Sequence, residues 1–572
     1  MSQTGGVADS AHPLSRVQRT RGDLGIPYLL ACVILAAFAF AFNWATGHRG
    51  MFLTDPSVIF DGGWRILQGQ AAYKDFLFPF GPLVFYIQAL FFRVFGVNWS
   101  AMVLPACVFN SLATLSVIRI VRLLGGGSRV LALCGGLATA ICFQAPFGTL
   151  WFEQVAMFFD LLALQAIVES SRATAYRRSL WQLAGGVSLA LAVLGKQNFG
   201  AFFVPIVVAV LVAGELPDVR RACRSVFFAG TGMAAALAIF LGWVWVYSDL
   251  SSFVECTLVL ASEIGRSRLS LKVIARALSF NIVPNLWQID LIGFFGGAVA
   301  LCLACFNFRR PLWRATAPAC VAALLLPLFH SLTQASTEQE FQNDFAFVGL
   351  AACLGVSLLS RLAGYLPNAP AADPGPGPGV HFPSARTLRI CIFALAGIWG
   401  AAVMAYEVRS AWTRMVQEFT ARTVFRDPIR VRGLERVRWG EPHVIQEITL
   451  RRVDFENLVS YLSARRSNFF VMGDSTILYG LLGVRPPQPL LYFVPGHSFL
   501  YRQIPRLDQM ISASLERNGI RLIVREKVMA EPLPIPDPYA VFPRTWAWFT
   551  DNFDHIRDFG NFEIWVRHEG SH

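Results

Sequence analysis

The feature that most restricts the fold of this chain is a series of long apolar runs between Ile26 and residue 407. An α-helix needs about 20 such residues to cross the hydrocarbon core of a bilayer, and most of the runs approach that length. Charged residues make up only 15% of the 572 positions, which excludes an ordinary soluble protein. We therefore predict a polytopic α-helical membrane protein with about eleven transmembrane helices. The expected spans are 26–44, 100–123, 129–146, 151–169, 181–195, 197–214, 223–247, 287–306, 314–331, 342–360 and 387–407.

Basic residues between the spans give the predicted bundle a direction. If the N-terminus lies inside, the inside loops all carry arginine, as positively charged loops on the cytoplasmic side do. An odd number of spans then places the C-terminal part outside. We expect a cytoplasmic tail at 1–25, a transmembrane domain at 26–407 with an outer loop at 45–99, and an outer domain at 408–572. The inside loops of this prediction are 123–129, 170–180, 215–224, 307–314 and 361–386.

The charge and cysteine content narrow the possible partners. The net charge of +12 is spread over separate loops and forms no basic stripe, so we expect membrane lipids as partners and no nucleic acid. The cysteines lie mostly inside apolar runs, where they are small buried residues, and none follows Cys391. The outer domain is therefore expected to fold without disulfides.

The outer domain alternates between helical and strand patterns, which predicts a small C-terminal extracytoplasmic α/β domain. Its Gly473-Asp474-Ser475 turn follows a predicted strand and is similar to a lipase-type serine motif. A serine hydrolase also needs a histidine and an oxyanion hole, so a plain turn after a strand is the favoured interpretation. The predicted elements are helices at 455–464, 506–517 and 546–551 and strands at 468–472, 520–525 and 562–566.

The first outer loop holds the densest group of polar residues. Short helices are expected at 57–67 and at 83–95, the second lying in the membrane interface because it is too short to span. Carboxylates at a membrane surface are costly unless they serve a purpose. Asp55, directly after the first span, is therefore a candidate general base, and Asp75 a candidate for related proton transfer. The candidates for substrate binding are Asp61, Arg65, Tyr73 and Lys74, with solvated loop charges as the alternative.

Further candidates lie where other spans reach the outer side. Lys196 and Gln197, between two apolar runs, suit an anion site, although a lysine that reaches from a helix end into water is the alternative. Glu153 opens the fourth span, where it would bind substrate or metal, or only favour the helix N-terminus. With a histidine it could hold a divalent metal, so a metal is possible, but no cofactor is certain. The remaining substrate-binding candidates are Arg266, Arg268, His330 and Glu338.

The run TDPSVIFDGGWRILQGQAAYKDFLFPFGPLVFYIQALFFRVFG resembles the first outer loop of the GT-C superfamily of glycosyltransferases. It is most similar to family 39-like enzymes, which include the protein O-mannosyltransferases and the lipid A aminoarabinose transferases. Pro56 stands where this family has the second acid of an Asp-Glu pair, so the paired acid's role has no counterpart in this chain. The matching residues are Asp55, Leu67, Gly69, Tyr73, Asp75, Phe76, Gly81, Pro82, Phe85 and Tyr86.

The resemblance implies a membrane enzyme that takes a sugar from polyprenyl phosphate, in bacteria undecaprenyl phosphate, and places it on an acceptor hydroxyl. It implies that Asp55 is the general base of an inverting reaction. The acceptor would be a lipid or a glycan, with a protein also possible. The expected location is the bacterial inner membrane, with the outer domain in the periplasm.

Two other classes of protein are compatible with the same composition. A transporter or flippase of a lipid-linked saccharide would need charges near the middle of the bilayer and an internal repeat. Charges near the middle of a predicted span are few: Asp160 and Glu169 lie toward the inner side of the fourth span, and no repeat is evident. A non-catalytic scaffold is the third class, and it would tolerate Asp55→Asn. The concentration of polar residues in one outer loop favours an enzyme.

Overall fold

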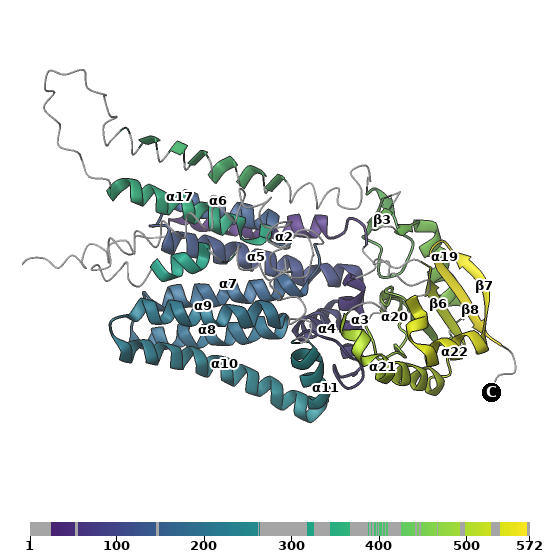
Figure 1. The fold of residues 1–572 in the computed structure, drawn as a ribbon. Helices are drawn as coiled ribbons and strands as arrows, with labels where there is room; N and C mark the ends of the chain where they lie inside the picture. Colours follow the sequence, from purple (N-terminus) through teal and green to yellow (C-terminus); the bar gives the residue numbers. More distant parts are fainter. Residues whose placement is uncertain are drawn as a thin grey trace, which may run out of the picture.

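The computed structural model describes residues 25–51, 55–144, 148–260, 262, 317–324, 326, 344–365, scattered positions between 387 and 409, 425–440, 443–445, 448–465, 467–491, 498–527 and 538–568. A bundle of long helices occupies one end of the molecule, and a domain built around a sheet occupies the other (Figure 1). Two short helices, α3 (Asp55–Leu67) and α4 (Leu83–Phe95), lie between them.

The helices of the bundle follow the predicted spans closely. Four of them, among the described residues, are long and apolar enough to cross a membrane: α2, α5, α9 and α10. The predicted span at 287–306 lies outside the described residues, and the spans at 314–331, 342–360 and 387–407 are described in part. The polytopic helical class is confirmed, while the number of spans stays a prediction. The bounds are α2 (Ile26–Thr46), α5 (Trp99–Leu124), α6 (Arg129–Cys142), α7 (Phe152–Ser170), α8 (Ala175–Gly195), α9 (Gln197–Glu215), α10 (Val219–Tyr247) and α17 (Val348–Tyr365).

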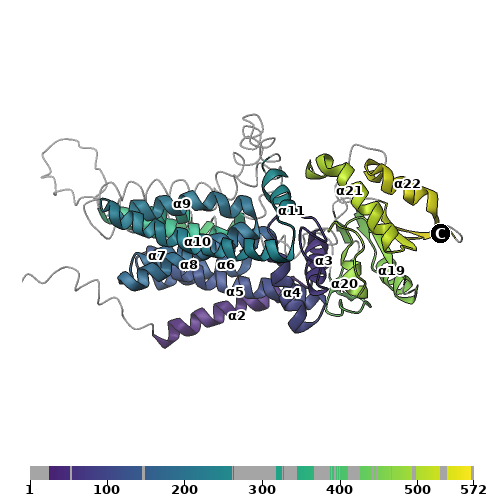
Figure 2. The same ribbon diagram turned by 90° about the horizontal axis from the view of Figure 1, so that it is seen from below.

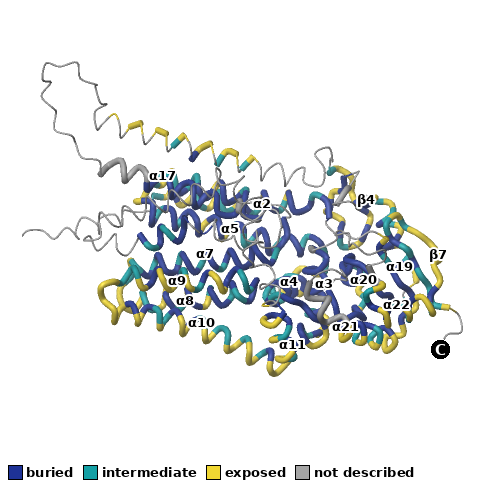
Figure 3. Tube along the Cα trace, viewed as in Figure 1, coloured by how far each residue is buried: buried dark blue, intermediate teal, exposed yellow. Residues whose placement is uncertain are grey.

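Apolar side chains cover both the inside and the outside of the bundle. Helices α5 and α7 are buried in its centre, whereas α10 runs along its surface (Figure 3). Phe227, Ile239 and Trp245 of α10 are each more than 60% exposed. A helix that is apolar on its exposed face is expected where the solvent is lipid. The surface of the bundle therefore fits a bilayer.

The C-terminal domain is built on a four-stranded sheet in the order β5-β6-β8-β7. Strand β5 (Phe469–Met472) runs parallel to β6 (Leu522–Glu526), and helix α21 (Ser498–Arg517) lies between them in the sequence. Parallel neighbours need such a crossover connection. The other two strands, β7 (Phe553–Phe559) and β8 (Phe562–Arg567), form an antiparallel hairpin. The predicted α/β domain is confirmed, and β7 is a strand that the sequence analysis missed.

Smaller elements complete this domain. Helices α19, α20 and α22 pack around the sheet (Figure 1). Two short antiparallel pairs, β1 with β2 and β3 with β4, precede α19 in the chain. The bounds are β1 (Asp427–Pro428), β2 (Arg438–Trp439), β3 (His443–Ile445), β4 (Ile448–Leu450), α19 (Arg452–Arg465), α20 (Ile477–Leu482), η5 (Pro538–Val541) and α22 (Pro543–Asn552).

The C-terminal domain is joined to the outer loop by main-chain hydrogen bonds. Arg438 N donates to His48 O at 2.8 Å, and Gly50 N donates to Arg438 O at 2.7 Å. Phe60 of α3 and Tyr479 of α20 belong to one continuous apolar core. Both ribbon views show α3 against α20 (Figure 2). The outer loop and the C-terminal domain therefore fold against each other as one body.

Candidate functional site

Two charged side chains meet at the end of the bundle that faces the first outer loop. Lys196 lies between α8 and α9, and its Nζ forms an ion pair and hydrogen bond with Oε1 of Glu153, in the first turn of α7. The exposed fractions are 9% for the lysine side chain and 5% for the glutamate side chain. The pair joins two of the positions that the sequence analysis singled out separately.

The first outer loop packs directly on this pair. Gln197 Nε2 donates to Pro79 O at 2.6 Å, which ties residues 79–82 to the junction between α8 and α9. Gly81 lies so close to that junction that a Cβ on it would overlap the carbonyl oxygen of Leu194. Only glycine allows this approach of two backbones. The loop residues and the buried ion pair are therefore held in one place.

Aromatic rings surround the lysine. Its Nζ lies 5.1 Å from the ring centroid of Phe80 and 5.2 Å from that of Phe199. An ammonium group over an aromatic face is attracted to the ring, more strongly when water is excluded. Lys196 is thus a cation held by one carboxylate and two rings, rather than a lysine that extends into water.

Tyr73 shapes the loop that carries Phe80. It is buried and has φ of 68°, a left-handed backbone that costs energy in a residue other than glycine. Its hydroxyl donates to Phe80 O at 2.5 Å, and its ring meets Phe253 edge to face at 5.1 Å. Burial raises the pKa of the Tyr73 hydroxyl well above its usual range, so it remains a donor. Tyr73 therefore holds the main chain of Phe80 in place beside the site.

Two buried oxygen atoms at the site are unsatisfied. Among the described residues, neither Glu153 Oε2 nor Gln197 Oε1 has a hydrogen-bond partner. A buried acceptor without a donor is costly, and such atoms are frequent where a ligand supplies the donor. Sugar hydroxyl groups are donors of this kind. The arrangement offers one cation for an anion and two acceptors for hydroxyl groups.

The other outer-loop candidates lie in different surroundings. Asp75 is exposed and its Oδ2 accepts a hydrogen bond from Ala71 N at 2.7 Å, which closes the turn before Phe76. Lys74 is exposed beside it. Asp55 is the first residue of α3, and its side chain lies outside the described part of the chain. The structure therefore places the predicted base at the start of α3.

Asp61 and Arg65 form the predicted pair one helical turn apart, but they do so away from solvent. Arg65 Nε donates to Asp61 Oδ2 at 2.9 Å, and both side chains are 0% exposed. Burial raises the pKa of Asp61 to about 6, against the opposing effect of Arg65. The alternative of solvated loop charges is therefore wrong for this pair, because the C-terminal domain covers it. Substrate binding by Asp61 and Arg65 stays a prediction.

Arg266, Arg268, His330 and Glu338 lie outside the described residues, and so does the histidine that was proposed to contact Glu153.

Sequence reasoning missed the π-helical turn η1 (Glu255–Val259), whose Thr257 O is 3.4 Å from Gln197 Nε2. Such turns are frequent at functional sites, but a π-helical turn has no signature in a single sequence.

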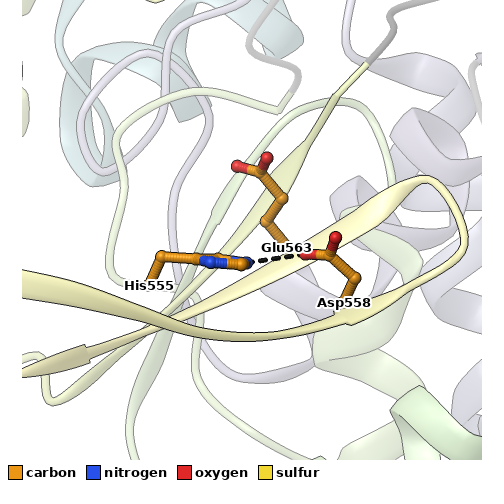
Figure 4. A group of neighbouring side chains, drawn as sticks. All are labelled: His555, Asp558 and Glu563. Atoms are coloured by element: carbon orange, nitrogen blue, oxygen red, sulfur yellow. Dashed lines mark hydrogen bonds and ion pairs between the residues drawn. The ribbon is translucent and has the colours of Figure 1, made fainter.

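A possible metal-binding group lies far from this site. His555, Asp558 and Glu563 on the β7–β8 hairpin place their ligand atoms within 4.8 Å of one another (Figure 4). Lys527 Nζ already neutralises Asp558 at 2.7 Å, and Arg525 pairs with Glu563 at 3.2 Å. Exposed carboxylates with basic partners are typical of a solvated sheet edge. This group has no connection with the Lys196 site.

The Gly473-Asp474-Ser475 turn is a structural corner. Ser475 N donates to Glu526 Oε1 at 2.8 Å at the end of β6. Burial raises the pKa of Glu526, which binds the turn rather than solvent. Ser475 is buried at this corner. The structure favours the plain turn over a hydrolase nucleophile.

Comparisons with known proteins agree with the fold. Residues 79–245 match a family model described as dolichyl-phosphate-mannose-protein mannosyltransferase. A comparison with curated proteins gives no match. The crystal structure of ArnT from Cupriavidus metallidurans bound to undecaprenyl phosphate is 13% identical, with a TM-score of 0.52 over 94% of this chain and 98% of that chain.

Two further solved structures are less similar. The apo state of the same ArnT gives a TM-score of 0.40 at 13% identity over 93% of this chain and 97% of that chain. The arabinosyltransferase EmbB from Mycobacterium smegmatis is 15% identical over 72% of this chain and 42% of that chain, with a TM-score of 0.38. The sequence match and the ArnT-like fold confirm the resemblance of this chain to GT-C glycosyltransferases of the protein mannosyltransferase and ArnT type.

Proposed function

We propose that the protein is a membrane glycosyltransferase that moves a sugar from a polyprenyl-phosphate donor to an acceptor hydroxyl on the outer side of the membrane. The observation that carries this proposal is the buried Lys196–Glu153 pair directly beneath the first outer loop. The polyprenyl chain would lie against the apolar helices, and its phosphate would lie at their outer ends. The ArnT structure with undecaprenyl phosphate and the mannosyltransferase family match support a lipid phosphate as the donor.

The residues have distinct roles in this proposal. Lys196 contacts the phosphate and stabilises the negative charge that develops as the bond from phosphate oxygen to the anomeric carbon breaks. Glu153 Oε2 and Gln197 Oε1 accept hydrogen bonds from sugar hydroxyls. Asp55 takes the proton from the acceptor hydroxyl as its oxygen attacks the anomeric carbon from the opposite face. The products are the inverted glycoside and free polyprenyl phosphate.

The test is sugar transfer in membrane vesicles by the wild type and by Asp55→Asn. The carboxamide cannot accept the proton, so we expect transfer to fall by at least about 100-fold with unchanged expression. A matched change on the next outer helix, Gln88→Asn, controls for the cost of a substitution in this region. Wild-type turnover by Asp55→Asn would remove the proposed base, and absence of transfer by the wild type would remove the proposed reaction.

A transporter or flippase is the second candidate. It would move the lipid-linked saccharide without breaking the sugar–phosphate bond. Vesicles that change the sidedness of the donor but release no free polyprenyl phosphate would favour it. The position of the Lys196–Glu153 pair at the ends of α7 and α8, rather than in the middle of the bundle, favours the enzyme.

A further inference from the structure

Helix α3 is held from outside by one extended segment of the C-terminal domain, residues 484–490, which we call the strap. The strap follows α20 in the chain. Trp64 Nε1 donates to Val484 O at 2.9 Å. Leu77 N, beyond the end of α3, donates to Pro489 O at 2.9 Å. The strap therefore binds the outer loop at points on both sides of the turn that carries Tyr73.

Arg65 is the centre of this contact. Its Nη1 donates to Gln488 O at 2.7 Å and its Nη2 to Leu490 O at 3.1 Å, while its Nε donates to Asp61. Nη1 also lies 3.4 Å from Gln70 Oε1. One guanidinium group thus joins a carboxylate of α3 to two carbonyl groups of the strap. A lysine has a single nitrogen at its tip and cannot reach these acceptors as the three separate nitrogens of the planar guanidinium group do.

The burial of the Asp61–Arg65 pair indicates that the pair fixes the position of α3 more than it stabilises the fold. Both side chains are 0% exposed, so forming the pair removes two charges from water. The cost of doing so offsets most of the attraction, and buried pairs of this kind are best known for fixing one arrangement among several. Every polar group that Arg65 satisfies lies on α3, on Gln70 or on the strap. What the pair determines is where α3 lies relative to the C-terminal domain.

The C-terminal domain also sets the distance to α3. Gly480 of α20 faces Phe60, and a Cβ on this glycine would lie 2.6 Å from the Phe60 ring. Trp64 is 3.4 Å away from the same position. A larger residue at 480 would therefore push α20 and α3 apart. The strap therefore binds α3 through hydrogen bonds, and α20 packs against α3.

We propose that the strap and Arg65 position Asp55 for the transfer reaction, so that the C-terminal domain is part of the catalytic apparatus. This inference rests on the proposed function. Asp55 and Arg65 stand on one helix, about 15 Å apart along its axis at about 1.5 Å per residue. A helix moves as a rigid unit over this length, so a shift at Arg65 displaces Asp55. Displacement of a reacting group by about 1 Å can reduce a rate by about 100-fold.

The experiment compares Arg65→Lys with Trp64→Phe in the full-length protein in nanodiscs. The second variant loses a single hydrogen bond to the strap and keeps an aromatic ring, so it folds even where the first does not. Hydrogen exchange of residues 55–67 should become about tenfold faster in both. We expect the kcat of transfer to fall about tenfold or more in Arg65→Lys and about threefold in Trp64→Phe. The KM for the polyprenyl-phosphate donor should change less than about twofold, because Lys196 is not disturbed.

Arg93→Lys is the matched control, since Arg93 is an exposed arginine of α4 in the same outer loop. Its exchange and its kcat should equal those of the wild type. Unchanged exchange of α3 in both variants, or faster exchange with a wild-type kcat, would overturn the inference. A wild-type protein that transfers no sugar removes the proposed function instead, and the exchange results still decide whether the strap holds α3.

Discussion

The ammonium group of Lys196 meets the carboxylate of Glu153 although the two residues are 43 positions apart in the sequence. Each stands at the end of a helix that faces the first outer loop, and the two rings of Phe80 and Phe199 exclude water from the lysine. In such surroundings, a charge without a partner is far more costly than on a surface. This cost makes the pair a sensitive point for mutation.

We predict that Lys196→Met raises the KM for the polyprenyl-phosphate donor by at least about tenfold, because the phosphate loses its cation and Glu153 becomes a buried charge without a partner. Steady-state kinetics with varied donor in nanodiscs measures the change. Lys527→Met, at an exposed position directly after β6, is the control. A KM and a kcat that both equal those of the wild type would show that Lys196 does not contact the donor phosphate.

Gly81→Ala should reduce transfer by at least about tenfold, because the added Cβ would overlap Leu194 O and separate the loop from the ion pair. Transfer per folded molecule, counted by size-exclusion chromatography, is the measurement. Gly230→Ala is the control: Gly230 lies in α10, and a Cβ there would meet nothing within 4 Å. Equal turnover by both variants would mean that this close approach has no bearing on the reaction.

Asp75 gives a prediction that separates chemistry from loop structure. Its carboxylate binds Ala71 N, and an asparagine can do the same through its carbonyl oxygen. We therefore expect Asp75→Asn to keep at least about a third of the wild-type kcat and Asp75→Ala to lose more. If instead both variants are equally inactive, Asp75 carries a proton in the reaction, as predicted from its place in the first outer loop.

The buried Asp61 predicts how stability depends on pH. Burial raises its pKa from 3.8 to about 6 in the folded protein, so the folded state binds this proton more tightly than the unfolded chain. The stability that Asp61 contributes is therefore complete below about pH 4 and is lost as the pH rises through about 6, by about 3 kcal/mol at most.

We expect the melting temperature of the wild type to fall more between about pH 4 and pH 6 than that of Asp61→Asn, whose amide does not titrate. Intrinsic-fluorescence melting in detergent over this range measures both. Parallel curves for the two proteins would show that Asp61 has the same pKa in the folded and unfolded states.

The sequence predicts the helices better than it predicts their contacts. The expected helix at 83–95 has those bounds in the structure, because Pro82 and Gly96 flank a run that is apolar except for Gln88 and Arg93. Helix α8 begins at Ala175, earlier than the predicted residue 181. The first turns of α8 contain Arg177 and Arg178, so the hydropathy of the sequence is low there although the residues are helical. Hydropathy reports the part of a helix that suits lipid, not the whole helix.

The candidate site could be predicted only one residue at a time. Lys196 and Glu153 each stand out as a charge at the end of an apolar run, but nothing in their spacing indicates that they meet. The Asp61–Arg65 pair follows from helical periodicity. Its burial does not, because the groups that cover it are main-chain carbonyls more than 400 positions away. Every residue has such a carbonyl, so it leaves no mark on the sequence.

The strap is bound through its main-chain carbonyl groups, and this affects how its sequence can evolve. The polar contacts that Arg65 and Trp64 make with residues 484–490 use peptide oxygens, so the exposed side chain of Arg485 can be exchanged without loss of those hydrogen bonds. By contrast, the buried side chain of Gln488 binds Tyr479 and Val471 and holds the strap in place. Pro486, Pro487 and Pro489 instead restrict the path of the backbone, which is what must persist. Related chains can therefore keep this junction while part of their strap sequence diverges, and an alignment would underrate the segment. A search for the junction in other chains should compare backbone paths and the arginine that binds them.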